Sequence, residues 1–143
     1  MIRLVTLVAL LLAGAGPSAQ NPPAATPKAL APLQGTWVLA APDGSTMANA
    51  ELALVITGNK YAQTLNGEVN ERGTITLDPA AKPMAIDLAI SEGPDAGKTQ
   101  LGVIEVSGDA MKGALKAPGD TVRPADFTPQ AGVITFVAKR KAK

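Results

Sequence analysis

From position 33 onward, the chain alternates short apolar stretches with turn-forming residues. No apolar pattern at helical spacing runs for more than about two turns, whereas Gly, Pro, Asn and Asp recur at intervals of roughly ten residues. This punctuation is typical of an all-β domain. It predicts eight strands, at residues 35–41, 52–57, 60–65, 68–78, 84–90, 99–106, 110–116 and 133–139.

Individual turn residues support these boundaries. Asn66 and Gly67 lie between two predicted strands, and because both tolerate a positive φ, they form the strongest short hairpin signal in the chain. Gly73 falls inside a predicted strand, where it indicates a bulge or a kink. Residues 45–51 could form a helical turn, and residues 117–130, which hold three prolines, are expected to wrap as a loop.

The order of the strands predicts the architecture. Eight consecutive strands, most of them joined by short turns, favour an antiparallel meander, and a meander protects its edge strands most simply by closing into a barrel. We therefore expect an all-β domain at residues 33–140, folded as an eight-stranded antiparallel β-barrel with short loops and little helix. A β-sandwich is the alternative.

The first nineteen residues have the three regions of an export signal. Arg3 precedes an apolar run at 4–13, and small residues follow. The run is well short of the roughly 20 residues that span a bilayer, so a signal peptide is favoured over an uncleaved anchor. Cleavage after Ala15 or after Ala19 fits the small residues there. We expect a signal peptide at 1–19 and a secreted or periplasmic protein.

Residues 20–32 hold four prolines and almost nothing to bury. Such a composition favours extended polyproline conformations and cannot offset the entropy that is lost on ordering. We interpret this segment as a Pro/Ala-rich tether. At the other end, residues 141–143 extend beyond the domain as a basic tail, which is expected to be solvated.

Composition excludes several classes of chemistry. The 143 residues include no Cys and no His, so the chain can form no disulfide, zinc finger or Ser-His-Asp triad. Its formal net charge of +1 gives no field that would attract nucleic acid or an acidic membrane surface. The length fits one domain of about 150 residues, with no room for a cofactor domain. We expect a monomer that is not an enzyme, has no cofactor and no nucleic-acid partner, and does not insert stably into a membrane after signal cleavage.

Some segments look like functional motifs but have simpler explanations. Residues 93–99 have the Gly, Lys and Thr of a phosphate-binding loop, yet only three residues separate the glycines and a strand follows. Asp78 at a turn and Asp87 on an outer strand face are better explained as a capping residue and a surface residue than as an acid–base pair. The loops at 94–97 and 119–121 lack the oxygens that calcium requires, so no metal site is expected.

Arg123 lies in the expected long loop. A salt bridge to Asp126 or to a carboxylate on the barrel wall is the favoured interpretation. An anion-binding mouth is the alternative.

Gly35-Thr36-Trp37, on the first predicted strand, resembles the Gly-x-Trp signature of the lipocalin and wider calycin superfamily. Together with residues 73–79, 82–88, 102–105 and 123–127, it resembles a lipocalin-like domain family of unknown function that is abundant in planctomycete bacteria. The similarity spans about residues 33–140, although this chain has Ile104 where the family often has an aromatic residue, and no Cys near 112–115. The resemblance implies a lipocalin-like barrel and export, and no catalytic residue.

The resemblance also implies how the barrel closes. In lipocalin-like barrels a basic residue after the eighth strand lies across the first-strand Trp. Here that residue would be Arg140, beside Gly35 and over Trp37, as a cation–π contact worth on the order of 1 kcal/mol.

The interior decides between two functions. One hypothesis is a mostly filled lower half under Trp37 and a small apolar pocket at the open end, where Tyr61 and Gln63 orient a ligand. The other, which the numerous aliphatic side chains equally allow, is a structural or interaction module with a dry core and an external surface for an envelope protein. For residues 99–106 the facing stays open between positions 101, 103 and 105 and positions 102, 104 and 106. Elsewhere, reading alternate positions inward gives Trp37, Leu39, Leu52, Leu54, Ile56, Tyr61, Gln63, Leu65, Ile75, Leu77, Met84, Ile86, Leu88, Ile90, Met111, Leu115, Ile134 and Phe136.

Overall fold

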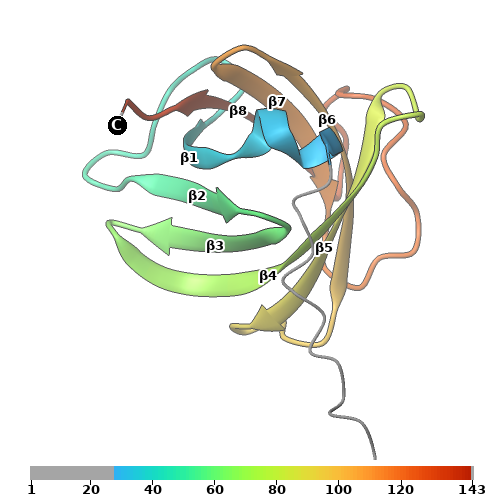
Figure 1. Ribbon diagram of the computed structural model, residues 1–143, viewed down its shortest axis with the longest axis horizontal. Coiled ribbons are helices and arrows are strands. Elements are labelled where there is room, and N and C mark those ends of the chain that lie inside the picture. Colours follow the sequence, from blue (N-terminus) through green and yellow to red (C-terminus); the bar gives the residue numbers. More distant parts are fainter. Residues whose placement is uncertain (1–27, 143) are drawn as a thin grey trace, which may run out of the picture.

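A computed structural model describes residues 28–142, so the expected signal peptide and most of the expected tether lie outside the described residues. Eight antiparallel strands form one closed barrel in which each strand pairs with the next, and the last pairs with the first (Figure 1). The predicted all-β barrel is confirmed, and a sandwich is excluded. The elements are η1 (Lys28–Leu33), β1 (Gly35–Ala40), β2 (Leu52–Thr57), β3 (Lys60–Leu65), β4 (Glu68–Asp78), β5 (Met84–Glu92), β6 (Thr99–Ser107), β7 (Ala110–Lys116) and β8 (Val133–Arg140).

The barrel has one end covered by η1 and one end bordered by loops. The loops at the second end, which we call the open end, are residues 41–51, the Asn66–Gly67 turn, residues 93–98 and residues 117–132. The expected helical turn at 45–51 is wrong, because this segment forms an irregular loop. Within residues 28–142, no helix has both the length and the apolar character that crossing a membrane requires.

The predicted tether is too long at its C-terminal end. Residues 28–33 form the 3-10 helix η1, and its Leu30 and Leu33 are only 2% and 1% exposed. Gln34 anchors this helix, since its amide exchanges two hydrogen bonds, of 2.7 and 2.9 Å, with the backbone of Gly58. The prolines of this segment favoured the prediction of an extended tether. Leu30 and Leu33 instead cover the apolar lower end of the barrel, and their burial stabilises the helix. Residues 28–33 therefore belong to the folded domain.

The interior largely follows the predicted alternation. Strand β6 turns Gly102, Ile104 and Val106 inward, and Ile104 is 1% exposed. Val103 is also buried, but on the outer face, where the 117–132 loop passes. Leu65 and Ile134 lie at strand ends beside the open end, so they are 39% and 56% exposed, although Ile134 still lines the cavity there.

Gly73 has the predicted irregularity, since the register between β4 and β5 shifts between Arg72 and Gly73. Its lack of a side chain also makes space for Tyr61, because a Cβ at this position would lie 2.7 Å from Cε1 of that ring. At the Asn66–Gly67 hairpin, both residues have positive φ, 52° and 84°, which confirms the predicted turn.

Candidate functional site

The closed end contains the predicted pair of Trp37 and Arg140. Trp37 is fully buried, and its Nε1 donates a 2.8 Å hydrogen bond to the carbonyl of Leu33 in η1. The Arg140 guanidinium carbon lies 4.3 Å from the centroid of the Trp37 ring. Gly35 is compatible with this packing, because its φ of 113° and the 3.2 Å between a Cβ there and Arg140 Nη1 both disfavour a side chain.

The guanidinium of Arg140 also links the end of β8 to the segment just before β1. Its Nη1 donates to the carbonyl of Gln34, and its Nη2 donates to the carbonyl of Pro32 at 2.7 Å. Its Nε donates to Asp109 Oδ1 at 2.9 Å, in the turn between β6 and β7. The contacts of Arg140 thus tie the segment before β1 and the β6–β7 turn to the barrel seam.

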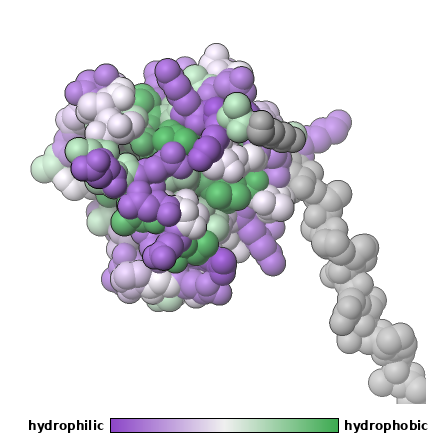
Figure 2. All heavy atoms as spheres, turned by 90° about the vertical axis from the view of Figure 1, so that its left-hand side faces the viewer, coloured by the Kyte–Doolittle hydropathy of each residue, from purple (hydrophilic) through white to green (hydrophobic). Residues whose placement is uncertain are grey.

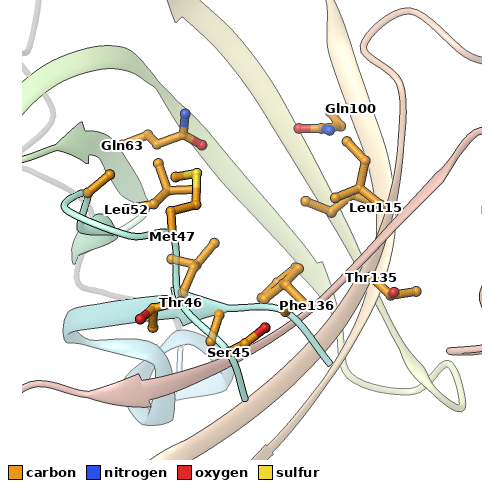
Figure 3. Close-up of a pocket in the computed structure, with 14 residues that line it drawn as sticks. Ser45, Thr46, Met47, Leu52, Gln63, Gln100, Leu115, Thr135 and Phe136 are labelled. Atoms are coloured by element: carbon orange, nitrogen blue, oxygen red, sulfur yellow. The ribbon is translucent and has the colours of Figure 1, made fainter. Parts of the chain in front are cut away.

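At the open end the barrel is hollow. A cavity of about 420 Å³ lies between the upper halves of β1, β2, β3, β6, β7 and β8 and the 41–51 loop (Figure 3). None of its fourteen lining residues is acidic or basic. They are Leu39, Ala40, Ala41, Ser45, Thr46, Met47, Ala50, Leu52, Gln63, Gln100, Leu115, Ile134, Thr135 and Phe136.

Two glycines position the large side chains at the base of this cavity. Gly102 is the register partner of Leu115, and Gly113 is the register partner of Phe136. A Cβ on Gly102 would meet the Leu115 side chain, and a Cβ on Gly113 would meet the Phe136 ring. The two large side chains therefore lie over their glycine neighbours and close the cavity from below.

The 41–51 loop forms one side of the mouth and is held at both ends. At its start, Ala41 N donates to the carbonyl of Ser45 at 2.9 Å, and Asp43 Oδ1 accepts from Ser45 N at 2.8 Å. Hydrogen bonds from Ser45 also lower the pKa of the Asp43 carboxyl. At its end, Glu51 and Asn66 exchange two hydrogen bonds of 2.8 Å. The loop is thus a shaped wall of the cavity.

The structure separates the two residues that were predicted to bind a ligand. Gln63 lines the cavity, whereas Tyr61 lies deeper, is 3% exposed, and donates its hydroxyl to Glu71 Oε1 at 2.8 Å. Burial raises the pKa of Tyr61, and the hydrogen bond to Glu71 and its negative charge raise it further. Tyr61 instead lines a narrow space of about 40 Å³ that continues downward from the cavity.

Gln100 is a residue of the cavity that the sequence did not reveal. It is 8% exposed and lies across the mouth from Gln63 (Figure 3). Its Nε2 donates to the carbonyl of Lys116 at 2.8 Å, and the Nε2 of Gln63 donates to Asn70 Oδ1 at 3.2 Å. The amide oxygens of both glutamines point toward the space between them (Figure 3).

Glu71 was missed as well. It pairs in register with Gln63, so it shares the inner face of the barrel, and it lines the narrow space together with Gln63 and Gln100. Strand alternation would place Glu71 on the same face as Gly73 and Ile75, which indicates an inward side chain. The register shifts beside it make this assignment unreliable from the sequence alone.

The remaining motif residues have structural roles. Arg123 donates to Asp87 Oδ1 at 2.6 Å and to the carbonyls of Ile86 and Gly102 at 2.9 Å each, which confirms the predicted salt bridge to the barrel wall. Asp78 caps the backbone N–H of Ala80 at 3.1 Å, as predicted. Asp126 accepts from the backbone of Thr128 instead of binding Arg123, and this hydrogen bond lowers its pKa.

In the loop at 93–98, Lys98 forms an ion pair with Asp95 at 3.1 Å, and strand β6 follows. Among the described residues, no three acidic side chains gather in a way that could hold a metal ion.

Together these features define an all-β barrel of lipocalin-like architecture with an apolar cavity at one end. No protein-family model, curated protein or solved structure matches the chain. The resemblance to the planctomycete domain family stays a prediction.

Proposed function

We propose that this protein is an exported, lipocalin-like binding domain that holds one small apolar molecule at the open end of its barrel. The observation that carries this proposal is the volume of the cavity, about 420 Å³. Natural ligand pockets have volumes of roughly 300 to 1,000 Å³, so the cavity has room for one small molecule. The narrow space below it, of about 40 Å³, is too small for one.

The wall and rim of the cavity support an apolar ligand. Leu39, Leu52, Leu115 and Phe136 give it an apolar surface, and removing such a surface from water contributes roughly 25 cal/mol per Å². At the rim, the large hydrophobic side chains of Met47 and Ile134 are 55% and 56% exposed. Figure 2 shows hydrophobic patches between hydrophilic side chains on one face of the molecule.

The lining also favours binding over catalysis. The hydroxyls of Ser45 and Thr46 border the cavity, but none of the fourteen lining residues carries an acid or a base that could take a proton from them. Gln63 and Gln100 supply neutral amides, which orient a ligand and transfer no proton.

The alternative, a structural or interaction module for an envelope partner, agrees with the filled lower half of the barrel. It assigns no role to the apolar cavity at the open end. Export is the second part of the proposal and is supported by the residue pattern at 1–19.

A titration with a neutral apolar fluorophore, N-phenyl-1-naphthylamine, tests the binding function. We expect a saturable fluorescence increase with one site per chain. Ala41→Trp places a large ring at the cavity wall and should weaken binding at least tenfold, whereas the control Ala125→Trp, on an exposed part of the 117–132 loop, should not. Absence of saturable binding would support the dry-core module instead.

A further inference from the structure

The amide groups of Gln63 and Gln100 direct hydrogen-bond acceptors toward the cavity and its lower extension. Gln100 is 8% exposed and uses its Nε2 on the carbonyl of Lys116, which leaves its Oε1 toward the cavity. Gln63 uses its Nε2 on Asn70 and likewise directs its Oε1 inward (Figure 3). A ligand whose polar head also only accepts hydrogen bonds would leave these oxygens without a partner.

Glu71 adds a negative charge to the same set. Its side chain lines the narrow space under the cavity, next to Gln63 and Gln100, and Tyr61 donates to its Oε1. Within residues 28–142, no Lys or Arg forms an ion pair with Glu71, and none lines the cavity or the narrow space. The carboxylate of Glu71 therefore has no ion-pair partner among residues 28–142.

This arrangement disfavours an anionic ligand. A bound carboxylate would add a second negative charge near Glu71 and would meet amide oxygens instead of amide N–H groups. A hydroxyl can donate to one of these oxygens, and an ammonium group can donate to several and also neutralise the charge of Glu71.

We propose that the cavity selects apolar molecules whose polar head donates hydrogen bonds and carries no negative charge, with alkyl amines bound best, alkyl alcohols next and fatty acids excluded. This inference rests on the proposed binding function and specifies its ligand class. Gln63 and Gln100 receive the donor head, and Glu71 supplies the counter-charge.

Displacement of N-phenyl-1-naphthylamine by three matched ten-carbon ligands tests this selection. Decylammonium, decanol and decanoate have the same chain and differ in the head, and each is used below its aggregation concentration at pH 7. We expect decylammonium and decanol to bind at least tenfold more tightly than decanoate, a difference of about 1.4 kcal/mol. Decanoate that binds as tightly as decanol would overturn the inference while leaving the binding function intact. A fluorophore that shows no saturable binding would instead overturn the proposed function.

Glu71→Gln isolates the counter-charge. The amide oxygen of the variant still accepts from the Tyr61 hydroxyl, so the local fold is retained. We expect the preference for decylammonium over decanol to disappear. Glu68→Gln is the control, because Glu68 lies exposed on the same strand, and this variant should keep the preference. Equal effects of the two substitutions would show that the preference arises from overall charge, which contradicts the assigned role of Glu71.

Discussion

Arg140, the last residue of β8, holds its guanidinium carbon 4.3 Å from the centroid of the Trp37 ring in β1. The two residues are also register partners, so the contact lies at the seam where the first and last strands close the barrel. The same guanidinium donates to the carbonyls of Pro32 and Gln34. One side chain therefore joins the seam to the segment that leads into the first strand.

Arg140→Ala should lower the free energy of unfolding by about 2 kcal/mol, because it removes the cation from the indole and the donors from two carbonyls. The fluorescence of Trp37, the single Trp, should change with it. Chemical denaturation measures the first effect and an emission spectrum the second. Lys139→Ala, at an exposed position next in the chain, is the control and should stay within about 0.5 kcal/mol of the native protein. An Arg140→Ala variant as stable as this control would show that the contact contributes nothing.

Gly113→Ala should displace the Phe136 ring toward the cavity, because the new Cβ would occupy the place of that ring. We expect the free energy of unfolding to fall by roughly 1 to 3 kcal/mol and the apolar fluorophore to bind more weakly. Adding Phe136→Leu should recover part of both losses. Without such recovery, the loss would have to arise from the backbone of β7.

Arg123→Ala should release the 117–132 loop from the barrel wall. The substitution leaves the carbonyls of Ile86 and Gly102 without their side-chain donor and Asp87 without its partner. We expect faster cleavage in this loop during limited proteolysis. Asp87→Asn should have a smaller effect, since Arg123 then keeps both carbonyl contacts. Equal cleavage of the native protein and Arg123→Ala would contradict this anchoring role.

Tyr61 is the single Tyr, so the absorbance change of phenolate formation reports on it alone. Because burial raises its pKa in the folded protein, we expect no ionisation near pH 10, where an unfolded Tyr titrates. The unfolded state then loses its proton first, so the stabilising effect of Tyr61 is full below pH 10 and declines as the pH rises above it. Glu71→Gln should lower the pKa of Tyr61 only in part, since burial is the larger cause. Ordinary titration near pH 10 in the folded protein would contradict the buried position.

Expression of the full chain in a bacterial host tests export. We expect the protein outside the cytoplasm, with a mature N-terminus between Gly16 and Asn21. Mass spectrometry of the exported protein measures this terminus. An intact apolar segment at 4–13 would contradict signal cleavage.

The strands and turns of this protein could be predicted from the sequence, because alternation and turn chemistry are local properties. Asn66 and Gly67 specify their hairpin through the positive φ that both tolerate, and no distant residue is needed for that. Strand ends were less certain: β8 extends to Arg140 because its backbone pairs with Trp37, a distant partner. The contact of Arg140 with Trp37 was expected from a resemblance, and not from any local pattern.

Tertiary structure alone decided which polar groups meet at the open end. Strand β6 is apolar on both faces, because the 117–132 loop buries Val103 on the outside, so alternation could not place Gln100 inside. Glu71 lies beside register shifts, which depend on the neighbouring strands. The burial of Leu30 and Leu33 in η1 depends in the same way on an apolar barrel end that forms only when all eight strands have closed. Local residue patterns thus determine the elements of this barrel, whereas packing between distant segments determines its cavity and the groups that face it.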